Sequence, residues 1–213
     1  MKQPSGFFGV TTAQNVEEPS IEDFWKKSSP TRDLIIAFTI IYLVLTILSL
    51  TFFVDTGYTG IVKVISISRI VLEWTGQYNL LILKGYIYEL FSAIFVHANL
   101  LHLLSNLLFF LIYGLRADER LYTKHFYIIF IVSALLGNLF TLLVYPVNTV
   151  SCGASGGVFG LLGADLILAY EEDKNRSIWT YLASGAIFLF ISAGVNVNSL
   201  AHGIGLVSGI ILM

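Results

Sequence analysis

The stretch Gly153-Ala154-Ser155-Gly156-Gly157 places a serine between glycines at the start of an apolar run. If a helix begins at Ser155, its N-terminal N–H groups and dipole favour a negative charge developing beside the serine. Polar groups at bilayer depth are costly and often mark functional sites. A contact between small residues of two membrane helices is the simpler interpretation, and for the motif alone it is the more common one. The rest of the chain decides between the two.

The composition around this motif is that of a membrane protein. Of the 213 residues, 56% are hydrophobic and 12% are charged, whereas soluble domains carry about 25% charged residues. The net charge of −2 argues against a nucleic-acid partner, and the single cysteine, Cys152, excludes an internal disulfide and a cysteine-based metal site. We therefore expect an all-α polytopic protein that has the lipid bilayer as its surroundings and uses no metal or cofactor.

Six apolar segments are predicted to cross the membrane, since a span needs about 20 residues. They are 34–54, 91–114, 126–144, 155–170, 178–193 and 199–213. Residues 1–33 carry charges and prolines and are expected to form a flexible arm, whereas 34–213 form the membrane domain. Residues 55–90 mix charges with Trp and Tyr, which is typical of a long first loop lying in the membrane interface. An ordinary surface loop is the alternative.

The distribution of positive charges predicts a cytoplasmic N-terminus. With that orientation, nine of the twelve Lys and Arg residues fall on the cytoplasmic side, and the other three lie in the loop 55–90. Positive charges concentrate in cytoplasmic segments. We expect an integral, multi-pass protein of a prokaryotic cell membrane.

With this topology, unusual polar residues of three spans fall at a similar depth in the outer part of the bilayer. The second span carries His97, His102 and Asn106 in its first half, the fourth begins at Ser155, and the sixth carries His202 in its first turn. Since His102 and Asn106 are four residues apart, they share one face of a helix. Three segments that place polar groups in one layer are hard to explain by chance.

The sixth span also carries small residues at the spacing that lets two helices pack closely. Gly205 and Gly209 form a small-x-x-x-small stripe, which permits a close approach to the glycine-rich fourth span. That approach brings His202 beside Ser155. A serine becomes a strong nucleophile when a base takes its proton, and histidine is the usual base. The pattern thus predicts a serine and a histidine that act together.

The remaining polar groups of this layer suit the support of such a pair. The Ser155 backbone N–H, the Asn106 amide and the His102 ring can donate hydrogen bonds to an oxyanion. Phe159 lies one turn below the serine, where its ring can pack against His202. Asp165 is roughly 15 Å from Ser155 along the helix axis, which is too far for a triad, so a dyad is the simpler hypothesis.

Three motifs follow one another along these spans. They are His97-Ala-Asn-Leu-Leu-His102-Leu-Leu-Ser-Asn106, Gly153-Ala154-Ser155-Gly156, and Ala201-His202-x-x-Gly205-x-x-x-Gly209. In this order they resemble the rhomboid family of intramembrane serine proteases, and the resemblance covers about 34–213. It implies a six-helix rhomboid bundle that cleaves transmembrane segments of other membrane proteins near the outer face of the membrane, without metal or cofactor.

The resemblance also implies roles for individual residues. Ser155 is the implied nucleophile and His202 the general base. His102 and Asn106 are implied oxyanion helpers, and His97 a structural hydrogen-bonding residue on the same helix. Gly153 and Phe159 complete the expected set of supporting residues.

Two positions depart from the family pattern. Family members often carry a Trp-Arg pair shortly before the second helix, where this chain has Tyr88-Glu89. The ring beneath the histidine is often Tyr, and here it is Phe159, which keeps the stacking surface and loses a hydroxyl. Neither departure touches the expected chemistry.

Three other readings of the same residues remain. A catalytically silent rhomboid-like scaffold that binds client transmembrane helices is the main alternative, and the presence of both Ser155 and His202 argues against it. The G-x-S-x-G pattern of soluble esterases needs a strand before the serine and an α/β sheet around it, and neither is predicted here. An ion or proton pathway through the histidines is disfavoured, since the polar residues cluster at one depth.

Overall fold

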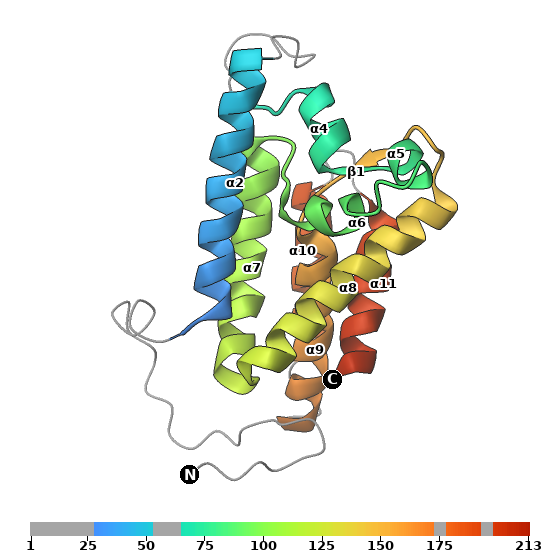
Figure 1. Ribbon diagram of the computed structural model, residues 1–213. Helices are drawn as coiled ribbons and strands as arrows, with labels where there is room; N and C mark the ends of the chain where they lie inside the picture. The colour runs from blue at the N-terminus through green and yellow to red at the C-terminus, as the bar shows by residue number, and fades with distance from the viewer. Residues whose placement is uncertain (1–27, 53–64, 173–177, 193–197) are drawn as a thin grey trace.

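The computed structural model describes residues 28–52, 65–172, 178–192 and 198–213, and most of these residues are helical (Figure 1). In chain order the elements are α2 Pro30–Phe52, α4 Arg69–Thr75, β1 Gln77–Tyr78, α5 Asn79–Leu83, α6 Glu89–Ser92, the 3-10 turn η1 Ala93–Phe95, α7 Leu100–Arg120, α8 Thr123–Val144, β2 Val150–Ser151, α9 Ser155–Glu172, α10 Ile178–Ser192 and α11 Ser199–Leu212. The long helices form a bundle. The short elements between α2 and α7 gather at one end of it, which we call the loop end.

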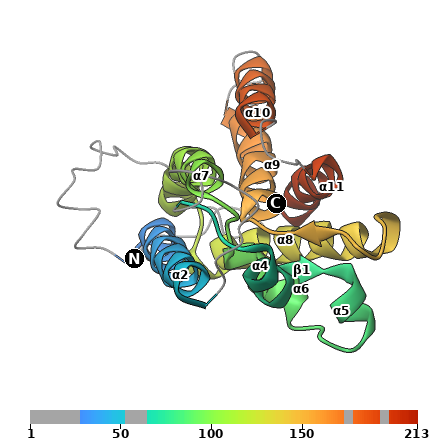
Figure 2. The ribbon, with the colours of Figure 1, turned by 90° about the horizontal axis from the view of Figure 1, so that it is seen from above.

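Helix α9 lies in the middle of the bundle, and α7, α8, α10 and α11 surround it (Figure 2). Glycines let α11 approach closely, because a Cβ on Gly205 would overlap the Gly156 carbonyl oxygen, and one on Gly209 would overlap the Gly160 carbonyl oxygen. Small residues are the usual way for membrane helices to bring their backbones together. The predicted contact between the fourth and sixth spans is therefore confirmed.

The described residues contain three helices that are long and apolar enough to cross a membrane: Pro30–Thr51, Leu100–Arg120 and Thr123–Val144. Helix α11 is apolar but shorter. The fold is a helical membrane bundle, as expected. Three expectations remain predictions: the number of six spans, the interfacial position of the loop 55–90, and the division into an arm and a membrane domain. Residues 1–27 and 53–64 lie outside the described part of the chain.

The predicted boundaries of the second span, 91–114, are wrong. Helix α7 begins at Leu100 because the Asn99 side chain caps it, accepting a hydrogen bond from the His102 N–H at 2.8 Å. The residues just before the cap are extended and bond across to the chain after α2, with the Ile67 N–H on the Ala98 carbonyl at 2.9 Å. The helix continues past the predicted end at Gly114 to Arg120, so the charged residues from Arg116 to Arg120 form its C-terminal end.

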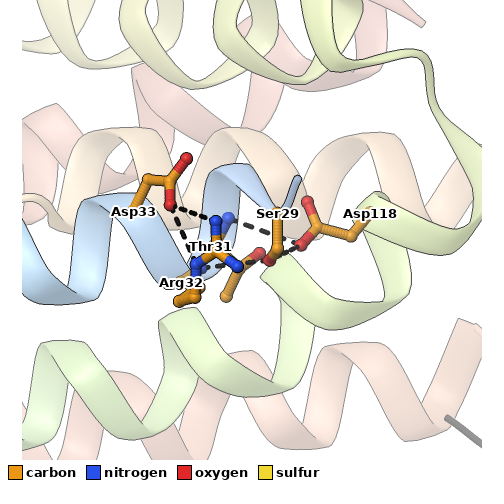
Figure 3. Close-up of polar contacts among 5 residues, drawn as sticks. All are labelled: Ser29, Thr31, Arg32, Asp33 and Asp118. Carbon is orange, nitrogen blue, oxygen red and sulfur yellow. Dashed lines mark hydrogen bonds and ion pairs between the residues drawn. The ribbon is translucent and has the colours of Figure 1, made fainter. Parts of the chain in front are cut away.

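The first span starts at Pro30, four residues before the predicted position, because a polar cluster fixes it to the end of α7 (Figure 3). Ser29 accepts a hydrogen bond from the Arg32 N–H at 3.1 Å and donates one to the Asp118 carboxylate. The same carboxylate accepts the Thr31 N–H at 3.4 Å. Proline suits the first helical position, where its missing N–H costs nothing. The Asp118 carboxylate therefore belongs to a contact between two helices.

The loop end is held together by buried polar side chains. Gln77 donates to the Asn138 carbonyl of α8 at 3.0 Å, and the Asn138 amide donates to the Leu90 carbonyl at 2.8 Å. Glu89 is fully buried and accepts the Tyr78 N–H at 2.8 Å, and its burial raises the pKa of the carboxyl group. Strands β1 and β2 pair antiparallel, with Gln77 opposite Ser151. The first loop is thus connected to the segment that leads into α9.

We expect Gly209→Ala to destabilise the bundle by about 1–3 kcal/mol, because the added methyl group must push α11 away from α9. The measurement is thermal unfolding of the purified protein in detergent. Gly203→Ala is the matched control, since it lies on the same helix and its Cβ would meet nothing within 4 Å. Equal melting temperatures for the two variants would contradict the prediction.

Candidate functional site

Ser155 and His202 come together at the loop end of the bundle. The Ser155 Oγ lies 2.7 Å from the His202 Nε2, which is hydrogen-bonding distance. Ser155 is the first residue of α9, and His202 is in the first turn of α11, as expected. The serine is half-buried and the histidine is 4% exposed. Two residues that are 47 positions apart in the chain therefore form one polar contact inside an apolar bundle.

The segment before Ser155 is fixed by a glycine with a special backbone. Gly153 has a φ of +123°, in the region that disfavours side chains, and its N–H donates to the Ala93 carbonyl at 2.9 Å. A Cβ at this position would lie 2.8 Å from the His102 Nε2 and 3.9 Å from the Ser155 Oγ. His102 and Ser155 thus border the same small space, and Gly153 keeps it open.

The His202 ring is held by stacking. Its centroid lies 4.6 Å from that of Phe159, with 18° between the planes. Phe188 of α10 lies nearly parallel to Phe159, with 5.0 Å between the ring centroids and 8° between the planes, and its centroid is 6.2 Å from that of His202. Among the described residues, the His202 Nδ1 has no hydrogen-bond partner. If Nε2 accepts the serine proton, the proton of the neutral ring resides on Nδ1.

The other two candidates, His102 and Asn106, lie in the first two turns of α7. Asn106 is 1% exposed, and its Nδ2 donates to the His102 carbonyl at 2.9 Å. An amide NH₂ group carries two hydrogens, so one remains for another acceptor. The His102 ring is half-buried, and its Nε2 points to the space that Gly153 keeps open. The His102 ring therefore can donate to an atom placed beside Ser155, in the tautomer that carries its hydrogen on Nε2.

His97 does not lie within the second span, as the sequence predicted, but in the extended segment before α7. The Asn99 cap excludes it from the helix. His97 is fully buried. Its ring packs edge-on against the rings of Phe38 and His102, with centroid distances of 5.5 Å and 5.3 Å. Among the described residues, neither of its ring nitrogens has a partner of good hydrogen-bond geometry, and the backbone of Phe95 interacts with the ring. In this structure His97 supports the His102 ring by packing.

Asp165 lies away from this site. Its carboxylate is 1% exposed and pairs with Arg116 of α7, with 3.4 Å between Oδ2 and Nε. The sequence-based exclusion of Asp165 from a triad agrees with this placement. No group of three or more His, Cys, Asp or Glu side chains suited to a metal ion occurs within the described ranges.

Sequence reasoning missed two residues beside the site. Phe188 was placed only within an apolar span, because nothing in the local sequence tells which face of α10 meets Phe159. Asn198 lies between two predicted spans, and it caps α11 by accepting the Ala201 N–H at 3.1 Å. An Asn directly before an apolar helical run is a recognisable N-cap signal. Its hydrogen bonds to other segments have no signal in the sequence.

Comparison with known proteins supports the resemblance that the motifs indicate. A family model described as the Rhomboid domain matches residues 84–213, which is more than half of the chain and includes all the site residues above. The relatives found are from bacterial and eukaryotic organisms. The expected prokaryotic membrane and the cytoplasmic N-terminus therefore stay predictions.

Three relatives illustrate the range of this similarity. The “Putative rhomboid protease YdcA” of Bacillus subtilis (strain 168) is 30% identical over 141 residues, which are 63% of this chain and 70% of the relative. “Rhomboid-like protease 3” of Toxoplasma gondii is 32% identical over 134 residues, 60% of this chain and 51% of the relative. “Rhomboid-like protein 11, chloroplastic” of Arabidopsis thaliana is 29% identical over 143 residues, 59% of this chain and 51% of the relative. The chain thus matches about half the length of these last two. It is an integral membrane protein of the rhomboid family.

Proposed function

We propose that this protein is an intramembrane serine endopeptidase that hydrolyses peptide bonds in or near transmembrane segments of other membrane proteins. Ser155 is the nucleophile and His202 is the general base. The observation that carries the proposal is the 2.7 Å contact between the Ser155 Oγ and the His202 Nε2 inside a helical membrane bundle. A nucleophile and a base within hydrogen-bond reach are the signature of an activated serine.

The first half of the reaction forms an acyl-enzyme. The Ser155 Oγ attacks the carbonyl carbon of the scissile bond while its proton passes to the His202 Nε2. The carbonyl oxygen becomes an oxyanion, which the Ser155 N–H, the His102 ring and the Asn106 amide stabilise. When the intermediate collapses, the C–N bond breaks, and the departing amine takes the proton from His202.

The second half regenerates the enzyme. Water attacks the ester carbon and gives one proton to the His202 Nε2. The ester bond to Ser155 then breaks, the serine oxygen recovers the proton from His202, and the new carboxyl end of the substrate leaves. Phe159 holds the imidazole ring in place during both halves, which replaces the orienting carboxylate of a triad.

The membrane determines the kind of segment that can be cut. In lipid, backbone groups pair within a helix, so a scissile bond is hidden until the helix unwinds. Small or helix-breaking residues near the cut make this unwinding less costly. We expect substrates with such residues close to the outer face of the bilayer, where water reaches Ser155.

Ser155→Ala and His202→Ala should each abolish cleavage, because each removes one member of the pair. The measurement is hydrolysis of a model single-span substrate in liposomes, together with labelling of Ser155 by a fluorophosphonate probe. Ser208→Ala is the matched control, since its hydroxyl bonds only to the Ile204 carbonyl of its own helix among the described residues. Cleavage at the wild-type rate by either dyad variant would overturn the proposal. An unlabelled wild-type protein that still binds client helices would favour a scaffold.

Gly153→Ala should lower the labelling rate by about 10²-fold, comparable to the loss of one oxyanion donor. The methyl group enters the space between His102 and Ser155, and the backbone conformation is itself unfavourable for alanine. Gly85→Ala is the control for backbone strain alone. Gly85 also has a positive φ, of +105°, but nothing lies within 4 Å of its Cβ position. Wild-type labelling of the Gly153 variant would contradict this account.

A further inference from the structure

The axial position of α11 along α9 decides whether His202 reaches Ser155. The helix backbones meet at glycines, with Gly205 over Gly156 and Gly209 over Gly160, and Gly163 lies against the backbone of Leu206. A shift of one residue moves a helix by about 1.5 Å, which is enough to break the 2.7 Å contact between Ser155 and His202. Hydrogen bonds that hold α11 along its axis therefore bear directly on this contact.

Asn198 is the side chain that connects the relevant segments. Its Oδ1 accepts the Ala201 N–H at 3.1 Å, which caps α11. Its Nδ2 donates to the Thr141 Oγ1 of α8 at 2.6 Å and to the Ser151 Oγ of β2 at 3.2 Å. Asn198 is four residues before His202, and Ser151 is four residues before Ser155. One amide group thus bridges the segment that ends in the nucleophile and the helix that carries the base.

The neighbouring hydrogen bonds require this orientation of the amide. The Thr141 hydroxyl donates its only hydrogen to the Gly137 carbonyl at 2.8 Å, so toward Asn198 it can only accept. The Ala201 N–H can only donate. Asparagine satisfies both sides at once, whereas aspartate keeps the cap and places a carboxylate oxygen against the Thr141 oxygen.

We propose that Asn198 is a positioning residue that sets the axial register of α11 against α9 and thereby the distance between Ser155 and His202. This inference rests on the proposed function and adds a residue that acts through His202 without touching the substrate. The cap on α11 contributes to stability, and the two bonds from Nδ2 contribute to register. The two contributions are separable by substitution.

The test compares Asn198→Asp with Asn198→Ala in the full-length protein. We expect the Asp variant to keep the melting temperature within a few degrees, because the N-cap survives. Its fluorophosphonate labelling rate and its kcat on the model substrate should fall about tenfold, with KM unchanged. The Ala variant should lose both stability and labelling. An Asp variant that labels at the wild-type rate, or one whose loss of labelling follows its loss of stability, would overturn the proposal.

A double-mutant cycle shows whether Asn198 acts through its Nδ2 bonds. Thr141→Val removes the acceptor of the shorter bond, so this single variant should label more slowly than the wild type. The double variant with Asn198→Asp should label no more slowly than Asn198→Asp alone. Fully additive losses would contradict the bridge.

A readout independent of activity separates this inference from the proposed function. Spin labels at Tyr170→Cys and Ile211→Cys, both exposed positions near the far ends of α9 and α11, in a Cys152→Ser background, report the distance between the helices. The Asn198→Asp variant should give a broader or shifted distance distribution. An unchanged distance distribution in the Asn198→Asp variant would overturn the register claim. If the distribution shifts in this variant but the wild-type protein cleaves no substrate, only the proposed enzyme activity is contradicted.

Discussion

The close contact between the backbones of α9 and α11 is the constraint on which the rest of the site depends. Gly205 and Gly209 let the two helices meet at a distance that any Cβ would prevent. Only at that separation does His202 reach Ser155 at 2.7 Å. In lipid such contacts are driven by packing, since hydrophobic burial distinguishes little between a helix partner and a lipid chain. The site is therefore a consequence of small residues as much as of polar ones.

Hydrogen bonds at the loop end add directional contacts to this helix packing. The antiparallel pairing of β1 with β2 holds the segment before Ser155, and the Gly153 N–H is bound to the Ala93 carbonyl. Asn138 and Gln77 connect the first loop to α8. Each of these groups has a defined partner, so directional hydrogen bonds place the nucleophile. Helix packing, ring stacking and the hydrogen bonds of Asn198 together place the base.

The two departures from the family pattern have different structural meanings. At Tyr88-Glu89 the carboxylate is buried and accepts a backbone N–H of β1, so the position still anchors the first loop, with an acceptor where relatives often have a donor. At Phe159 the lost hydroxyl leaves the stacking on His202 intact, and the nearly parallel ring of Phe188 packs near both rings. Neither change removes a group from the contact between serine and histidine.

The sequence alone determined the membrane class, the glycine stripe and the pairing of Ser155 with His202, because long apolar runs and short polar motifs carry their physical meaning locally. It misplaced His97 and the ends of α2 and α7, since caps such as Asn99 and the Ser29–Asp118 contact compete with apolar length in deciding where a helix begins. The bridge from Asn198 and the stack of Phe188 were decided only by the tertiary structure. Both depend on which face of one segment meets another, and no local pattern encodes that.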